Sequence, residues 1–499
     1  MMLLGFDIGS SSIKAGLVDA ESGSMVAWAN SPEQELAMNA PQPGWAEQNP
    51  ATWWKHAKLA TRKVLDKSEI NPEEIAAIGI SYQMHGLIIV DQEHNVLRPA
   101  IIWCDGRAVD IGNRAYQELG EDFCKQHFLN SPGNFTASKL RWVKENEPEI
   151  YERVHKFMLP GDYIGMKLTG KILTSVSGLS EGIMWDYKKH SLAKELLDFY
   201  EIDEELVPEA VLNFSDQRKL SPEAASELGL QPGTPVTYRA GDQPNNALSL
   251  NVLDPGEVAS TAGTSGVIYG VTDQPLYDEY SRVNTFIHVN HEEDHERYGV
   301  LLCINGTGIQ NSWLKNKMFN SQYSYQKMNE RAAKIPVGSE GISILPFGNG
   351  PERVLKNSNI GAHICNIDFN RHNEAHLMRA AQEGIAFSLN YGLKVMKEMG
   401  LTINTIRVGS GNMFRSPVFR EAFTNITGAT VELYDSNGAL GAAIGAGLGA
   451  GIFSSREEAF NNLEQIAVLQ PNKEKQELYS EAYESWEKIL LEELSENSL

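Results

Sequence analysis

Residues 3–19 read LLGFDIGSSSIKAGLVD, and residues 257–273 read EVASTAGTSGVIYGVTD. Each stretch has an apolar run, a short turn of glycine and hydroxyl residues, and a second apolar run, which is the pattern of a β-hairpin. The turns align as Gly-Ser-Ser from Gly9 and Gly-Thr-Ser from Gly263, at an offset of 254 residues. One such unit near the start of each half predicts an internal duplication of domains.

Helical and strand patterns alternate between and after the two hairpins. Residues 50–68 have a helical period, and residues 75–83, IAAIGISYQ, read as a buried strand. In the second half, residues 376–400 read as a long helix and residues 403–411 as a strand that enters a glycine-rich turn. This alternation is typical of an α/β architecture.

The domain boundary is expected near residues 243–256, where turn-forming residues separate two strong strand patterns. This divides the chain into domains of residues 1–247 and 248–499. A chain of 499 residues is too long for one hydrophobic core, so two large domains also agree with its length.

The charge of the chain argues against two classes of partner. It has 43 Lys and Arg against 65 Asp and Glu, a net charge of −22. Such a field opposes attachment to nucleic acid or to anionic membranes, so an anionic ligand must be held by local donors. The uncharged stretch 438–453 is short for a membrane span and rich in Gly and Ala, which favours a closely packed internal helix.

The cysteines and the first residues favour a reducing, cytoplasmic location. The four cysteines form no C-x-x-C pair, so neither a disulfide framework nor a zinc site is indicated. The N-terminal apolar run is short and has no basic residues before it, unlike a secretory signal.

Asp7 ends the first apolar run and is followed by Gly9 and three serines. A carboxylate there can hold hydrated Mg²⁺ while the backbone N–H groups and hydroxyls of the turn approach phosphate oxygens. The alternative is a solvent-facing hairpin in which Asp7 only forms the turn. The second hairpin has Thr261 opposite Asp7, so two small-residue turns, one with an acid, could clamp a polyphosphate between them.

Asp242 follows an apolar strand and a glycine in YRAGDQPNNA. An acid at the mouth of an interdomain cleft can accept the proton of a hydroxyl nucleophile, as in phosphoryl transfer, although an ordinary strand-to-loop aspartate fits the same pattern. Residues 408–419 form a strand, a glycine-rich turn and a helix, which suits a nucleotide. They match neither the dinucleotide fingerprint nor the Walker A spacing.

With these motifs the chain resembles the FGGY-type carbohydrate kinases, which include glycerol kinase, gluconokinase and xylulokinase. The resemblance covers nearly the whole length and rests on DIGSSSIK (7–14), GDQ (241–243), AGTSG (262–266), GSGN (409–412) and GALGAA (438–443). The pattern is most similar to that of the xylulokinases through WAEQNPATWW (45–54), SYQMHG (81–86), RPAIIWCDGR (98–107), FTASKLRWVKENEPE (135–149) and LPGDYIGMKLTG (159–170).

The resemblance implies two actin- and hexokinase-like, ribonuclease H-like α/β domains with a catalytic cleft between them. It implies ATP-dependent phosphorylation of D-xylulose to D-xylulose 5-phosphate, with the sugar mainly on the first domain, the nucleotide mainly on the second, and a homodimer. It makes Asp242 the catalytic base and Asp7 the Mg²⁺ contact. Residues implied for the sugar are Met84, His85, Trp103, Asp105 and Arg107, with Asp242. Those implied for the nucleotide are Ser10, Ser11, Lys14, Gly263, Thr264, Ser265, Gly409, Gly411 and Asn412.

Two departures from the xylulokinase pattern bear on the choice of sugar. Tyr82 stands where xylulokinases usually have glycine, and Gln243 where they usually have asparagine. A kinase of the same family acting on ribulose, a heptulose, gluconate or a polyol therefore stays an alternative. An actin-like ATPase without sugar kinase activity is a more remote one, because a fold alone does not fix a function.

Several conspicuous side chains are assigned to structure instead of chemistry. His288, His291 and His295 are expected at an exposed hairpin tip, and His372 and His376 on a solvated helix face. Cys104 and Cys303 are expected to fill the core from apolar strands. Near the C-terminus, one helical stripe is expected to dock on the core, namely Tyr479, Tyr483, Trp486 and Leu490.

Overall fold

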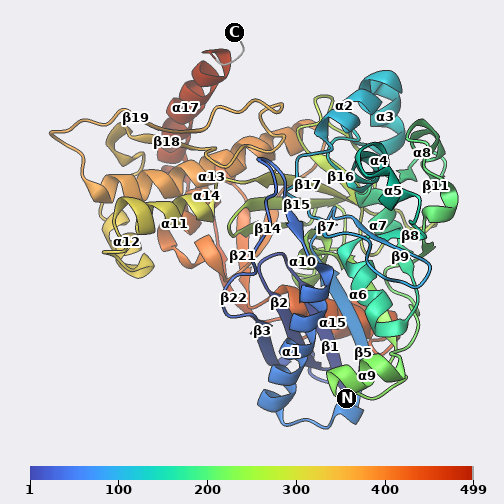
Figure 1. Ribbon diagram of the computed structural model, residues 1–499. Helices are drawn as coiled ribbons and strands as arrows, with labels where there is room; N and C mark the ends of the chain where they lie inside the picture. The colour runs from blue at the N-terminus through green and yellow to red at the C-terminus, as the bar shows by residue number, and fades with distance from the viewer. Residues whose placement is uncertain (497–499) are drawn as a thin grey trace.

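Two large sheets, one from each half of the chain, lie at the centre of the computed structural model, which describes residues 1–496 (Figure 1). The first has the order β13-β5-β1-β2-β3, and the second β16-β17-β15-β14-β20-β21-β22. The strands of the first sheet are β1 (Met2–Ile8), β2 (Ile13–Asp19), β3 (Met25–Ser31), β5 (Ile75–Tyr82) and β13 (Val236–Gly241). Those of the second are β14 (Val258–Ala262), β15 (Gly266–Thr272), β16 (Asn284–Ile287), β17 (Tyr298–Ile304), β20 (Thr405–Gly409), β21 (Thr430–Tyr434) and β22 (Gln465–Leu469).

The same topology occurs in both sheets. In the first, β3, β2 and β1 run antiparallel, and β5 and β13 follow β1 in parallel. In the second, β17, β15 and β14 run antiparallel, and β20 and β21 follow β14 in parallel. The two predicted hairpins are β1–β2 and β14–β15, and they hold equivalent places in this order, which confirms the duplication.

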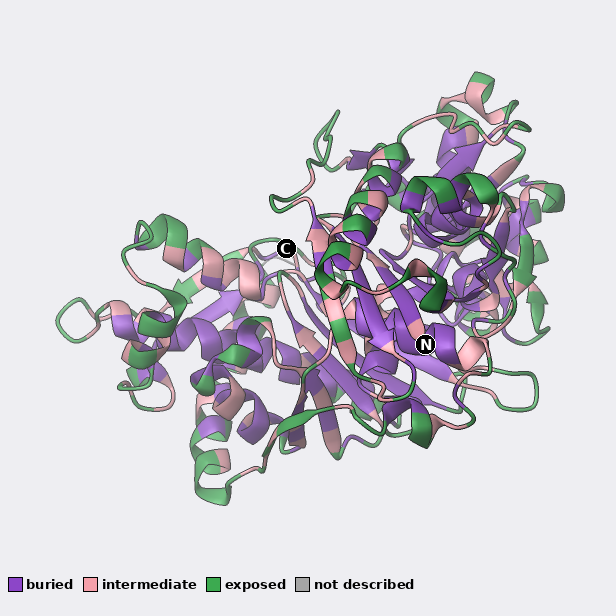
Figure 2. Ribbon diagram, turned by 90° about the horizontal axis from the view of Figure 1, so that it is seen from below, coloured by how far each residue is buried: buried purple, intermediate pink, exposed green. Residues whose placement is uncertain are grey.

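Helices cover both sheets, and most of the long ones agree with the sequence patterns. The pattern over residues 50–68 forms α1 (Pro50–Ser68), and the long helix of the second half is α13 (Glu374–Glu398). The terminal helix is α17 (Lys473–Glu496), and its predicted apolar stripe is buried in the core of the second half. Figure 2 shows the buried strands enclosed by helices whose outer faces are exposed.

Helix α15 (Gly438–Gly449) belongs to the second half but packs on the sheet of the first. Its small residues allow a very close approach, because a Cβ at Gly5 would lie 2.1 Å from the Ala439 carbonyl oxygen and one at Gly79 2.0 Å from that of Ala442. The predicted closely packed internal helix is confirmed, and it ties the end of the chain to its beginning.

The structure corrects four local expectations. Part of the turn-forming segment at the expected boundary is a helix, α10 (Asp242–Ser249). His288 is fully buried, where its ring bonds the Tyr269 hydroxyl and the Val252 carbonyl. His376 is buried where its ring accepts the Asn373 N–H at the start of α13, and Cys104 is exposed in a turn. For the two histidines a polar partner in the fold outweighs the sequence pattern, and for Cys104 a turn does.

The remaining elements connect and cover the two sheets. The other α-helices are α2 (Val109–Glu118), α3 (Glu121–Phe128), α4 (Thr136–Asn146), α5 (Pro148–Tyr151), α6 (Pro160–Thr169), α7 (Val176–Glu181), α8 (Lys194–Phe199), α9 (Pro222–Leu228), α11 (Gly308–Trp313), α12 (Tyr325–Ala332), α14 (Pro417–Thr427) and α16 (Arg456–Phe460). Short strands are β4 (Glu47–Gln48), β6 (Ile88–Val90), β7 (Ala100–Ile101), β8 (Lys156–Met158), β9 (Leu173–Ser175), β10 (Trp185–Asp186), β11 (Ser191–Leu192), β12 (Glu209–Val211), β18 (Ser343–Pro346) and β19 (Ala362–Cys365).

Candidate active site

Three parallel strands of the first sheet bring the predicted acids to one edge. Asp7 near the end of β1 is in register with Ser81 of β5, and Gly241 at the end of β13 is in register with Tyr82. Asp242 follows directly after Gly241 as the first residue of α10. Ligands bind at the carboxyl ends of such strands because the loops that leave them meet there.

Asp7 lies in a polar setting that also touches the second half. Its carboxylate accepts hydrogen bonds from Lys14 Nζ at 2.9 Å and Ser81 Oγ at 3.3 Å. A Cβ at Gly438 would lie 2.5 Å from Asp7 Oδ2, so the start of α15 approaches this carboxylate. The pKa of Lys14 is raised, chiefly by the charge of Asp7.

Asp242 has the protonation behaviour of a group that can accept a proton near neutral pH. Its pKa is raised from 3.8 to about 7, first by burial and then by the negative charge of Asp7. A general base works best when its pKa lies near the operating pH. The first sheet therefore places one acid beside Lys14 and a second acid, with a raised pKa, close to it.

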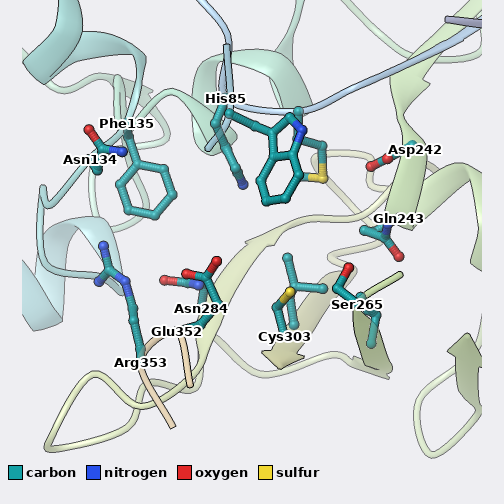
Figure 3. A pocket seen from close by; sticks show the side chains of 14 residues that line it. His85, Asn134, Phe135, Asp242, Gln243, Ser265, Asn284, Cys303, Glu352 and Arg353 are labelled. Carbon is teal, nitrogen blue, oxygen red and sulfur yellow. The ribbon is translucent and has the colours of Figure 1, made fainter. Parts of the chain in front are cut away.

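A cavity opens next to Asp242, and the two halves of the chain contribute equally to its wall (Figure 3). The first half supplies Met84, His85, Trp103, Asn134, Phe135, Asp242 and Gln243. The second half supplies Ser265, Val267, Asn284, Leu301, Cys303, Glu352 and Arg353. Of the predicted site residues, the structure brings together Met84, His85, Trp103, Asp242 and Ser265 in this wall.

His85 points into the cavity from the loop after β5, with its backbone in the left-handed region at φ 58°. Its Nδ1 lies 3.0 Å from the Glu181 carbonyl oxygen, which can only accept, so Nδ1 carries a proton. Burial and then the charge of Lys139 lower the pKa of His85 to about 3. The ring is therefore neutral at pH 7, and its Nε2 is left as a hydrogen-bond acceptor.

Glu181 at the end of α7 holds His85 from behind the cavity wall. Its Oε1 accepts the His85 N–H at 3.4 Å, and its Oε2 would lie 2.7 Å from a Cβ at Gly241, next to Asp242. Glu181 is buried and forms no ion pair with any residue between 1 and 496. Burial raises its pKa well above 4.5, because surroundings without water disfavour the charged carboxylate.

The predicted sugar residues after β7 divide into two groups. Trp103 lines the cavity and its Nε1 lies 3.4 Å from Ser10 Oγ of the first hairpin. The side chains of Asp105 and Arg107 are fully buried and pair with each other at 2.7 Å, with the Arg107 guanidinium 3.8 Å from the Trp45 ring. They lie behind the wall and brace the segment that carries Trp103.

The two predicted nucleotide turns of the second sheet lie side by side. They follow β14 and β20, which are parallel neighbours, and a Cβ at Gly263 would lie 3.3 Å from Asn412 Nδ2. Thr264 is exposed in the first turn, whose Gly263 carbonyl accepts the Thr307 hydroxyl at 3.0 Å. In the second turn a Cβ at Gly411 would meet no atom within 4 Å, so this backbone is open to a ligand.

The other predicted nucleotide residues lie mainly on the first hairpin. Ser10 and Ser11 lie in the turn of the first hairpin, Lys14 on β2 and Gly409 at the end of β20. Of the two departures from the xylulokinase pattern, Gln243 lines the cavity, whereas Tyr82 is fully buried behind it.

Part of the cavity wall consists of residues that the sequence patterns do not predict. Asn134, Asn284, Glu352 and Arg353 come from loops and strand ends whose local patterns give no sign of a shared site. Cys303 was expected in the core of its strand, and it lies on β17 but also faces the cavity. Only the resemblance offered a signal, through the motif that begins at Phe135.

Two family models together match most of the chain. The model for the N-terminal domain of the FGGY family of carbohydrate kinases matches residues 2–249, and that for the C-terminal domain matches residues 258–450. The chain belongs to the FGGY family of carbohydrate kinases. It is therefore a sugar phosphotransferase, as expected from its motifs.

The individual proteins that this chain matches include kinases named for different sugars. Xylulose kinase of Bacillus subtilis is 28% identical over 493 residues, which cover 98% of this chain and 96% of that protein. The structure of xylulose kinase from Rhodospirillum rubrum has a TM-score of 0.87 at 24% identity, covering 100% of both chains. Gluconate kinase from Lactobacillus acidophilus has a TM-score of 0.89 at 22% identity, covering 100% of this chain and 99% of that one.

These matches confirm the expected two-domain, actin- and hexokinase-like fold. The xylulose kinase and the gluconate kinase superpose on this chain almost equally well. None of the helices within residues 1–496 combines the length and the apolar character that a membrane span requires.

Proposed function

We propose that the chain transfers the γ-phosphoryl group of ATP to the 5-hydroxyl of D-xylulose, which gives D-xylulose 5-phosphate. The observation that carries the proposal is the position of Asp242, whose carboxyl group has a pKa of about 7 and lines a cavity together with Met84 and His85. Family membership supports the reaction class, and the similarity to xylulose kinases over nearly the full length supports the sugar.

In this mechanism Asp242 accepts the proton of the sugar hydroxyl as that hydroxyl attacks phosphorus. The neutral ring of His85 accepts a hydrogen bond at Nε2 from another sugar hydroxyl and so orients the substrate. Because phosphoryl transfer has a loose transition state, alignment and charge neutralisation make the main contribution. The walls from both halves surround the substrate and limit the access of water.

The hairpin turns after β1 and β14, and the turn after β20, would hold the nucleotide. Their small residues leave backbone N–H groups open to phosphate oxygens, and Thr264 adds an exposed hydroxyl. Lys14, beside Asp7, supplies a positive charge at the same place.

The residues present fit Mg²⁺ as a partner of the phosphates. Mg²⁺ is usually held by one or two carboxylates together with water and substrate phosphate. Asp7 offers such a carboxylate, and among residues 1–496 no cluster of three or more His, Cys, Asp or Glu forms a complete metal cage. Bound there, the ion would neutralise charge on the phosphate oxygens.

A kinase for gluconate is the second candidate. The superposition with a gluconate kinase supports the fold for it, and the cationic Arg353 in the cavity wall suits a carboxylate. The other acceptors that the family resemblance left open are ribulose, a heptulose and a polyol.

The deciding experiment measures ADP release with D-xylulose, D-ribulose, a heptulose, xylitol and D-gluconate, for the wild type, Asp242→Ala and Asp242→Asn. Asp273→Asn, an exposed aspartate on the second half, is the matched control. We expect D-xylulose to give the highest kcat/KM and both Asp242 variants to lose at least about a hundredfold. The kinase assignment fails if no sugar stimulates turnover or if Asp242→Ala keeps full activity. Preference for another sugar refutes only the xylulose assignment.

A further inference from the structure

Arg353 is a cation in the cavity wall. It lies between β18 and β19 of the second half, yet its guanidinium lies 4.9 Å from the ring of Phe135 in the first half. A Cβ at Gly133 would lie 2.0 Å from one of its nitrogens, so the guanidinium fits only because this residue is glycine. Within residues 1–496, the guanidinium forms neither a hydrogen bond nor an ion pair.

A guanidinium in this state has unused binding capacity. It presents five N–H donors in a planar fork that suits carboxylate and paired oxygen acceptors. Burial lowers the pKa of Arg353, which shows that the site favours its charge less than water does. An oxygen ligand in the cavity would restore the hydrogen bonds that the protein does not supply.

The position of Arg353 identifies the part of the substrate that it can reach. Figure 3 shows Arg353 and Asp242 on opposite sides of the cavity, with Asn284 and Glu352 near Arg353. Glu352 is already engaged, since its Oε1 accepts a hydrogen bond from Asn305 Nδ2 at 2.6 Å. An extended sugar whose reacting hydroxyl lies at Asp242 would therefore present its other end to Arg353.

We infer that Arg353 binds the oxygen atoms at the end of the substrate remote from the phosphorylated hydroxyl, and so helps to choose the sugar. For a ketopentose these are the oxygens on C1 and C2. The inference rests on the proposed function, because it takes the reacting hydroxyl to lie at Asp242. It gives the second half of the chain a direct part in sugar recognition, beside the nucleotide contacts expected there.

The test pairs changes in the enzyme with changes in the substrate. We would measure kcat/KM of the wild type, Arg353→Gln and Arg353→Lys with D-xylulose, 1-deoxy-D-xylulose, xylitol and D-ribulose. The first two analogues are altered at C1 and at C2, whereas D-ribulose differs at C3. Lys356→Gln removes a positive charge from an exposed position on the same loop and is the control.

With D-xylulose, we expect Arg353→Gln to lose roughly tenfold to a hundredfold in kcat/KM, mainly through KM, since one set of charged hydrogen bonds is removed. Arg353→Lys should recover part of this loss, and Lys356→Gln should stay within about twofold of the wild type. In Arg353→Gln, kcat/KM with 1-deoxy-D-xylulose or xylitol should nearly equal kcat/KM with D-xylulose. The ratio of kcat/KM between D-ribulose and D-xylulose should stay as in the wild type.

The inference is overturned if the loss in kcat/KM from Arg353→Gln is independent of the loss from altering the sugar, at C1 and at C2 alike. The combined loss would then be the product of the two separate losses. A merely structural Arg353 would give that result, because it would lower activity equally with every sugar. Thermal melting of each variant shows whether it is folded, and Arg353→Lys provides the comparison if the Gln variant is not. A wild type that no sugar stimulates would instead refute the proposed function.

Discussion

Replacing Asp242 by asparagine should abolish activity and at the same time make the folded protein more stable at alkaline pH. The pKa of Asp242 is raised from 3.8 to about 7 by burial and by Asp7, so the folded state binds a proton that the unfolded state has already released. The free energy of unfolding therefore falls as the pH rises from about 4 to about 7, and it stays at this lower value above about pH 7. An asparagine side chain does not titrate, so the Asp242→Asn variant avoids this loss.

The size of the effect follows from the pKa. The pKa rises from 3.8 to about 7, and each pKa unit corresponds to about 1.4 kcal/mol. The free energy of unfolding of Asp242→Asn can therefore exceed that of the wild type by at most about 4 kcal/mol at pH 8. Asp242 is only partly buried and faces the open cavity, so we expect about half of this, roughly 2 kcal/mol. For domains of this size, that corresponds to a rise in melting temperature of about 4 to 8 °C.

The assay is thermal melting of the wild type and Asp242→Asn, followed by circular dichroism at pH 5 and pH 8. The melting temperature of Asp242→Asn relative to the wild type should be clearly higher at pH 8 than at pH 5. Asp273→Asn, on the surface, should show the same difference from the wild type at both pH values. If Asp242→Asn and the wild type respond identically to pH, then Asp242 is not strained in the folded protein and the reasoning is wrong.

Three further outcomes are expected. The kcat/KM of the wild type should fall about tenfold per pH unit below about pH 7, since Asp242 must lose its proton to act as a base, and initial rates of ADP release from pH 5 to 9 would show this. Glu181→Gln should keep kcat/KM within about threefold, because the amide oxygen still accepts the His85 N–H, whereas Glu181→Leu should raise KM about tenfold, as measured by sugar titration. Gly79→Val should destabilise the fold by at least about 3 kcal/mol in thermal melting, since its Cβ would lie 2.0 Å from the Ala442 carbonyl oxygen.

Each of these expectations has an outcome that would contradict it. A rate profile that stays flat down to pH 5 would show that Asp242 is ionised well below neutrality. Equal losses in Glu181→Gln and Glu181→Leu would mean that the hydrogen bond from the His85 N–H does not explain the role of Glu181. Ala76→Val, a half-exposed position on the same strand as Gly79, should melt near the wild type; if Gly79→Val does so too, α15 does not pack as closely as described.

Features set by short-range interactions were predictable from the sequence. Both hairpins could be placed because apolar alternation and Gly-Ser turns fix local backbone geometry. The same holds for α1 and α13, whose helical periods show directly in the order of residues. Asp242 could be proposed because a strand, a glycine and an acid follow one another in the chain, and the resemblance to a kinase family supplied its role.

Contacts between distant segments were not predictable. His288 was assigned to an exposed tip because its neighbours are acidic, but Tyr269 and Val252 enclose it in the fold. Arg353 and Glu181 stand in stretches without a recognisable motif, and their importance arises only from what lies opposite them.

The order of residues along the chain is enough to predict two related α/β halves, each with a small-residue hairpin, and an acid after a buried strand. Those features depend on residues that are neighbours in the chain. Three further features appear only in the folded protein: Asp7 lies close enough to Asp242 to raise its pKa, α15 crosses to the first sheet, and half of the cavity wall comes from the second half. Such properties depend on packing and burial, which bring together residues that are hundreds of positions apart.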